Sequence, residues 1–120
     1  METRTGSCHC GAVVFDVELE NGLQNLRRCN CSLCRRKGAI MASVPVQKLK
    51  VVDGKDQLSL YQWNKKIARH YFCKHCGIYT HHQRRSNPAE FGFNVACIEG
   101  VDPFELEDIG VSDGASNSLD

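Results

Sequence analysis

The sequence predicts a mainly β domain supported by metal, and three observations lead to this prediction. Short runs of alternating apolar and polar residues recur along the chain, as expected for half-buried strands. No segment shows the sustained i, i+3, i+4, i+7 apolar spacing of an amphipathic helix, so we expect little helix. Seven of the eight cysteines fall in three tight clusters, and a chain of only 120 residues gains stability from a metal that joins distant segments.

The expected strands begin with the segment 13–20, where Val13, Phe15 and Val17 alternate with more polar neighbours and Asn21-Gly22 provides a closing turn. Further extended segments follow at 39–46, 48–52, 58–63, 67–72, 78–82 and 91–95. Segments 58–63 and 67–72 are expected to form a hairpin. Its aromatic residues, including Trp63, are expected to pack in the core.

Length and composition favour a single zinc-binding domain over residues 1–111. Residues 112–120 consist largely of Ser, Gly, Asn and Asp, which bury little surface, so a flexible C-terminal tail is expected there. The segment 29–37 is polar and rich in cysteine, and we expect a loop with one helical turn.

Charge and hydropathy narrow the class of partner and the compartment. The formal net charge is +1, which does not favour nucleic acid or an acidic membrane surface as a partner. Residues 1–6 are polar, and no segment is apolar over the length of a membrane span, so we expect a cytoplasmic protein. Thiols stay reduced in the cytoplasm, which favours cysteines as metal ligands over disulfides.

Two of the clusters are half-sites for structural zinc. Cys8 and Cys10 lie two positions apart and would share one face of a strand, while Cys73-x-x-Cys76-Gly77 has the spacing of a zinc knuckle. Together they would form a closed tetrahedral site that contributes folding free energy. Cys73 and Cys76 could instead join two cysteines of the middle cluster. We favour the first arrangement because it leaves no half-site without a partner.

The middle cluster, Cys29, Cys31 and Cys34, then supplies three thiolates, which is the ligand number of a catalytic zinc site with one open position. Zinc there would accept an incoming thiol as thiolate. Basic residues surround the cluster at Arg27, Arg28, Arg35, Arg36 and Lys37, and the last three are the expected contacts for the carboxylates of a small anionic thiol. Alternatively, a histidine closes a second structural site; the candidates are His9, His70, His75, His81 and His82. One of His81 and His82 could also act as a base.

In this order and spacing, the motifs Cys-His-Cys-Gly, Cys-x-Cys-x-x-Cys and Cys-x-x-Cys-Gly resemble those of the glutathione-dependent formaldehyde-activating enzyme family, which also includes centromere protein V. The resemblance extends from about Gly6 to Asp102. It implies a β-tent fold of small antiparallel sheets around a structural zinc. Carried over by motif, the structural ligands are Cys8, Cys10, Cys73 and Cys76, and the active-site zinc ligands are Cys29, Cys31 and Cys34.

The family's reaction adds glutathione to formaldehyde to give S-hydroxymethylglutathione, a carbon–sulfur lyase reaction in reverse. The resemblance therefore implies a zinc-dependent lyase that handles the adduct of glutathione, or a similar thiol, with formaldehyde or another small aldehyde. An enzyme that uses the same site on a different glutathione conjugate is a related possibility. The alternative from another class is a non-catalytic zinc module that binds protein or chromatin, which the resemblance to centromere protein V permits.

Overall fold

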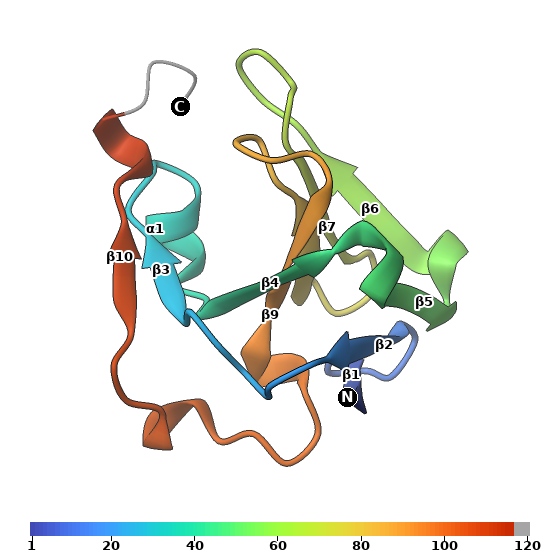
Figure 1. Cartoon of the computed structure of the whole chain (residues 1–120). Helices are drawn as coiled ribbons and strands as arrows, with labels where there is room; N and C mark the ends of the chain where they lie inside the picture. Colours follow the sequence, from blue (N-terminus) through green and yellow to red (C-terminus); the bar gives the residue numbers. More distant parts are fainter. Residues whose placement is uncertain (117–120) are drawn as a thin grey trace.

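A computed structural model describes residues 1–116 and confirms the mainly β prediction (Figure 1). The strands form a three-stranded sheet in the order β1-β2-β5 and a seven-stranded sheet in the order β10-β3-β4-β9-β8-β7-β6. Their bounds are β1 Glu2–Ser7, β2 Val14–Leu19, β3 Arg27–Cys29, β4 Met41–Pro45, β5 Leu49–Asp53, β6 Leu58–Tyr61, β7 Arg69–Cys73, β8 Tyr79–Gln83, β9 Glu90–Asn94 and β10 Gly110–Ser112. The expected strands thus correspond to β2 and β4 to β9.

Helical structure in residues 1–116 is limited to short turns, as the sequence predicts. The α-helix α1 covers Cys34–Lys37, at the helical turn expected in the segment 29–37. The 3-10 turns are η1 Val46–Lys48, η2 Lys55–Gln57, η3 Val95–Cys97, η4 Pro103–Glu105 and η5 Gly114–Ser116. Over the same residues, no helix has the length and apolar character that crossing a bilayer requires.

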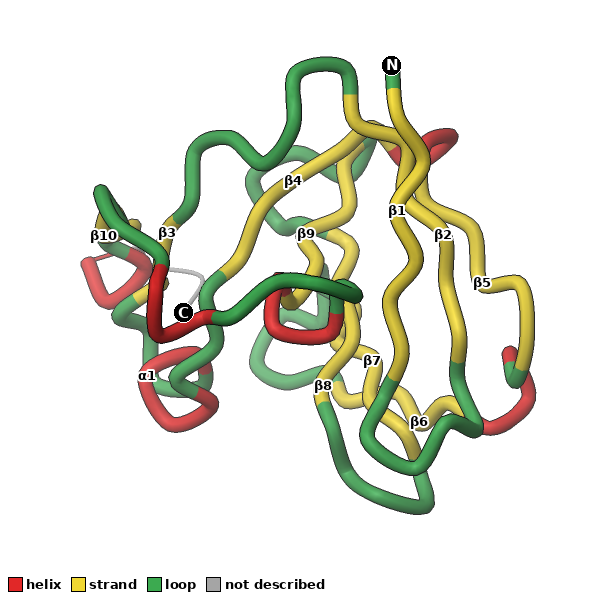
Figure 2. Tube along the Cα trace, turned by 90° about the horizontal axis from the view of Figure 1, so that it is seen from below, coloured by secondary structure: helices red, strands yellow, loops and turns green. Residues whose placement is uncertain are grey.

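The core lies where the two sheets meet. Phe15 and Val17 of β2 pack with Ala42 and Val44 of β4 and with Phe93 of β9. The alternation of β2 places its apolar residues on the face turned toward the large sheet, since successive side chains of a strand point to opposite sides. Figure 2 shows β1, β2 and β5 beside the large sheet, with β3, β10 and α1 at the sheet's far edge.

Strand β1 was not expected from the sequence, because its residues are polar and give no apolar alternation. It is an edge strand that pairs with β2 through backbone hydrogen bonds, with Gly6 opposite Phe15. Gly6 is the one buried residue of β1, and a Cβ atom there would overlap the Phe15 ring. The aromatic ring therefore lies directly over the glycine.

One face of the large sheet carries a row of residues from four neighbouring strands. Ser43 of β4 pairs with Gly92 of β9, Gly92 pairs with His82 of β8, and His82 pairs with His70 of β7. Directly paired residues of antiparallel strands project from the same face, so these four positions share one side of the sheet. The candidate site is built on this side.

The C-terminal segment differs from the flexible tail expected from residue 112. Strand β10 pairs in parallel with β3, with Ser112 opposite Cys29, and η5 follows. The Asn30 side chain donates to Asp113 Oδ1 at 3.0 Å and accepts from the Ala115 backbone N–H at 2.9 Å. Hydrogen bonds rather than apolar burial hold this segment, which is why its polar composition misled the prediction. The remainder of the expected tail, residues 117–120, lies outside the described residues.

Candidate functional site

Four cysteines converge where the two sheets adjoin. Cys8 follows β1, Cys73 ends β7, and Cys10 and Cys76 belong to the turns beside them; all four sulfur atoms lie within 4.8 Å of one another. Sγ of Cys10 is 3.7 Å from Sγ of Cys8 and 3.7 Å from Sγ of Cys73. A tetrahedral zinc with Zn–S bonds of about 2.3 Å needs sulfurs about 3.8 Å apart, so these residues fit a closed zinc site.

Backbone N–H groups point at these sulfurs and favour their thiolate form. The N–H of Val13 donates to Cys8 Sγ at 3.3 Å, and the N–H of His75 donates to Cys73 Sγ at 3.4 Å. Backbone hydrogen bonds, first that from Cys10, lower the pKa of Cys76 to about 6. Because such bonds disperse negative charge, the group can hold several thiolates around one cation.

Cys29, Cys31 and Cys34 form the second group, which we call the cysteine trio. Cys29 ends β3 and Cys34 begins α1, and the three sulfurs lie within 4.8 Å of one another. Among residues 1–116, no further His, Cys, Asp or Glu joins the trio. The hydrogen bond from the Cys34 thiol lowers the pKa of Cys29 to about 5 and raises that of Cys34. Three soft ligands with a thiolate among them suit a zinc ion that keeps a fourth position open.

The turn η5 packs against the trio. A Cβ atom at Gly114 would lie 2.6 Å from Cys29 Sγ and 2.9 Å from Cys31 Cβ, closer than such contacts occur. The parallel pairing of β10 with β3 brings this glycine to the sulfurs. The C-terminal segment thus forms one side of the site, a role that its composition did not indicate.

The trio opens on a cavity of about 110 Å³. The other walls include Trp63, His70, His82 and five basic residues: Arg27, Lys65, Lys66, Arg84 and Arg85. None of the described lining residues is acidic, so the cavity favours an anionic ligand. Trp63, expected in the core, contributes to this wall instead. Lys65, Lys66, Arg84 and Arg85 were not expected at the site, although Arg84, directly after β8, lies two residues from His82, a spacing that indicates a shared face.

The three basic residues expected to contact substrate, Arg35, Arg36 and Lys37, do not line this cavity. All three belong to α1. The Arg36 side chain donates to the Ser32 carbonyl at 2.6 Å. The Lys37 ammonium lies 3.3 Å from the Tyr79 ring centre and donates to His70 Nδ1 at 3.2 Å, and burial lowers its pKa to about 8. Lys37 thus supports the cavity wall through His70.

Two neighbouring histidines have different environments. His81 packs in parallel with Tyr71, at 4.8 Å between ring centres, and bonds to Thr80, away from the cavity. His82 lines the cavity, stacks on His70 at 5.1 Å, and is hydrogen-bonded through Nδ1 to the Tyr79 hydroxyl.

The His82 ring rests on Gly92. A Cβ atom at Gly92 would meet Nδ1 at 3.0 Å and Nε2 at 3.1 Å, so the missing side chain makes room for the imidazole. Burial lowers the pKa of His82 well below its usual range, and burial followed by the Lys37 charge lowers that of His70 to about 4. Both rings are therefore neutral at pH 7.

The fold and the two cysteine groups define a mainly β protein with two sites that could each hold a metal ion. The sequence profile of the family described as glutathione-dependent formaldehyde-activating enzyme matches residues 3–108, and the chain belongs to this family.

Two relatives extend the comparison. A Halomonas elongata protein named as a candidate glutathione-dependent formaldehyde-activating enzyme is 36% identical over 80 residues, which cover 59% of this chain and 50% of the relative. The match therefore spans about half the length of that protein. A Rhodobacter sphaeroides protein with a crystal structure is similar in fold, with a TM-score of 0.86 and 55% identity, over 90% of this chain and 99% of that one.

Proposed function

We propose that this chain is a zinc-dependent enzyme of the carbon–sulfur lyase class that adds glutathione, or a similar thiol, to formaldehyde or another small aldehyde. One observation carries the proposal: three cysteines without a fourth described ligand open on a cavity with basic and no acidic lining residues. The family and the name of the Halomonas elongata relative support glutathione and formaldehyde as substrates. Cys8, Cys10, Cys73 and Cys76 would hold a structural zinc, and Cys29, Cys31 and Cys34 a second one.

A zinc ion on the trio supplies, when bound, the positive charge that converts an incoming thiol to thiolate. In the addition, the thiol sulfur forms a bond to the carbonyl carbon while the carbonyl π electrons move to oxygen. That oxygen takes up one proton, which balances the proton lost by the thiol. The residues of the cavity have to hold the thiol near the trio and to stabilise the charge that develops on oxygen.

His82 suits the second task. Its Nδ1 is hydrogen-bonded to the Tyr79 hydroxyl, and when that hydroxyl donates, the neutral ring carries its proton on Nε2. A donor in the cavity wall can hydrogen-bond to the developing alkoxide and stabilise its charge, while the alkoxide takes its proton from solvent. His70, stacked on His82 and bonded to Lys37, keeps this ring in place.

The proposal is tested by the rate of S-hydroxymethylglutathione formation and breakdown, measured by NMR exchange because formaldehyde also combines with thiols without a catalyst. The protein should accelerate the exchange, and Cys31→Ser should abolish the acceleration while circular dichroism shows an intact fold. Equal rates with the wild type, the variant and buffer would contradict catalysis. Glutathione binding without acceleration would indicate a thiol-binding module instead.

A further inference from the structure

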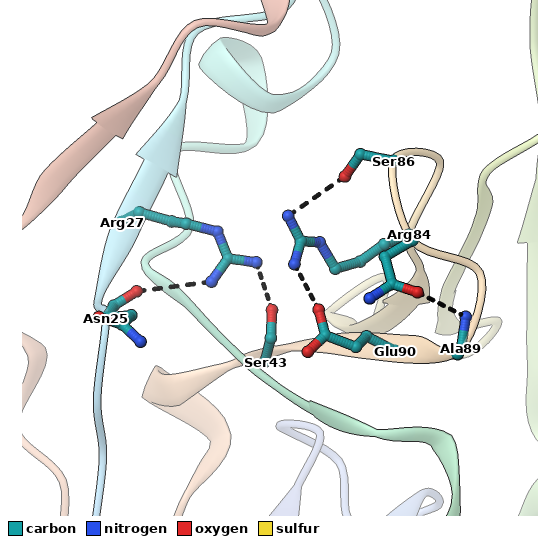
Figure 3. Close-up of polar contacts among 8 residues, drawn as sticks. Asn25, Arg27, Ser43, Arg84, Ser86, Ala89 and Glu90 are labelled. Atoms are coloured by element: carbon teal, nitrogen blue, oxygen red, sulfur yellow. Dashed lines mark hydrogen bonds and ion pairs between the residues drawn. The ribbon is translucent and has the colours of Figure 1, made fainter.

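Two arginines extend toward each other across the face that carries the site. Arg27 begins β3 and Arg84 follows β8, and these two strands flank the β4–β9 pair in the sheet. Figure 3 shows both guanidinium groups above β4 and β9, facing each other. Both residues line the cavity beside the trio and a second cavity of about 480 Å³. The arginine pair therefore stands between the sulfur atoms and the larger space.

The pair has more donors than acidic partners. Arg27 donates to neutral acceptors, Ser43 Oγ at 2.5 Å and the Asn25 carbonyl at 3.5 Å. Arg84 donates to Glu90 Oε1 at 2.6 Å and to Ser86 Oγ at 3.3 Å. Each guanidinium has five N–H donors, so donors remain on both residues. In the same wall, Arg85 Nε is buried and has no hydrogen-bond partner among residues 1–116.

The charges are also unbalanced. In the described contacts the two guanidinium groups have one carboxylate partner, Glu90, which pairs with Arg84, and the Arg84 side chain is only 27% exposed. Partly buried like charges destabilise each other, and an anion placed between them would relieve the repulsion.

The distances along the chain suit a ligand that reaches both the trio and the arginine pair. Arg27 and Cys29 lie two positions apart on one face of β3, and their Cα atoms are therefore separated by about 7 Å. In a tripeptide thiol, a terminal carboxylate lies one residue from the cysteine, and each extended residue adds about 3.3–3.6 Å. A single small molecule can therefore place its sulfur at the trio and a carboxylate at the arginines.

We propose that Arg27 and Arg84 jointly bind a carboxylate of the thiol substrate and make the site selective for acidic thiols. The inference rests on the proposed function, because it takes the trio as the site of the same molecule's sulfur. Arginine is well suited to this role because its planar fork donates two parallel hydrogen bonds to a carboxylate. The residues named for this role in the sequence analysis, on α1, lie outside the cavity lining.

The test compares glutathione with its diethyl ester, in which both carboxylates are neutral, by calorimetric titration of the metal-loaded chain. Wild-type protein should bind glutathione at least about tenfold more tightly than the ester, as expected for a charge-assisted hydrogen bond. Arg27→Gln and Arg84→Gln should each reduce this preference about tenfold and leave binding of the ester unchanged. Arg28→Gln is the matched control, since Arg28 is exposed on the opposite face of β3 and should keep the full preference.

The outcomes separate the two proposals. Equal affinity of wild-type protein for glutathione and the ester would overturn the carboxylate site while leaving the thiol site intact. An equal loss in Arg28→Gln would also overturn it, because the preference would then reflect overall charge. If neither compound binds, the proposed function fails and the inference fails with it. If Arg27→Gln does not fold, the wild-type comparison of the two ligands and the Arg84→Gln variant still test the carboxylate site.

Discussion

Replacing Gly92 with alanine is a sharp test of the packing of His82 on this glycine. The substitution is expected to lower the free energy of unfolding, whereas glycine-to-alanine changes in strands usually raise it. In a strand with free space, alanine is more stable than glycine by about 0.5–1 kcal/mol. Here the new methyl group would meet the His82 ring at Nδ1 and Nε2, 3.0 and 3.1 Å away, in a buried position. The ring cannot retreat freely, since it is stacked on His70 and bonded to Tyr79.

Overpacking of this kind costs about 1–3 kcal/mol, so we expect a net loss of about 1–2 kcal/mol in the free energy of unfolding. With an unfolding entropy of about 2.1 cal/mol/K per residue, this corresponds to a decrease in Tm of about 4–8 °C for this chain. Circular dichroism melting measures the shift. Glutathione–formaldehyde exchange should decline as well, because a displaced imidazole changes the cavity wall that His82 forms.

The matched comparison uses His82→Ala as the background. Without the ring, the methyl group at position 92 meets no imidazole, so Gly92→Ala should become neutral or stabilising. The two substitutions should then show a coupling of about 1–3 kcal/mol. An unchanged or higher Tm for Gly92→Ala in the wild-type background would refute the packing of His82 on Gly92.

Three further predictions follow from the cysteine groups and the buried histidines. Cys73→Ser should lower Tm far more than Cys31→Ser, since Cys73 belongs to the group between the two sheets; melting with metal analysis, with and without chelator, measures both effects. Gly114→Ala should displace Cys29 Sγ, 2.6 Å from the new Cβ, and weaken metal retention at the trio in chelator competition; retention equal to wild type would contradict the contact. Burial lowers the pKa of His81 to about 4. The contribution of its neutral ring to the free energy of unfolding should therefore be fully present above the unfolded pKa of about 6.5. That contribution should decrease by about 1.4 kcal/mol per pH unit as the pH falls toward 4. Urea titrations at several pH values should show that the free energy of unfolding of His81→Gln depends less steeply on pH than that of the wild type. Equal pH dependence in the two proteins would contradict a neutral buried ring.

Local patterns were sufficient for much of the fold. The alternation in β2 identifies both a strand and its buried face, because a side-chain period of two residues is specific to extended backbone. The cysteine spacing identified sulfurs that lie close together but not the local backbone: Cys8 and Cys10, expected on one face of a strand, lie after the end of β1 and in a turn. The number of ligands in a tetrahedral site favoured the grouping of Cys8 and Cys10 with Cys73 and Cys76, but left open a pairing of Cys73 and Cys76 with the middle cluster.

The sequence was less informative where backbone pairing or contacts between distant segments determine the structure. Strand β1 is polar and is held by β2, and the segment 112–116 is held by Asn30, so neither has an apolar pattern. Closeness to the cysteines in sequence favours Arg35, Arg36 and Lys37 as substrate contacts, but these residues of α1 do not line the cavity. Pairing across the sheet instead brings in Arg84, which lies 50 residues beyond Cys34.

A metal on the trio with one position open to thiols is tested most directly by the metal content of anaerobically purified protein. A cobalt-substituted sample is then titrated with glutathione and monitored at its thiolate–metal absorption. We predict two metal ions per chain and a change in the signal of one of them, absent in Cys31→Ser. The open site would be contradicted by one metal ion per chain, or by two, if the thiolate–metal absorption does not change when glutathione is added.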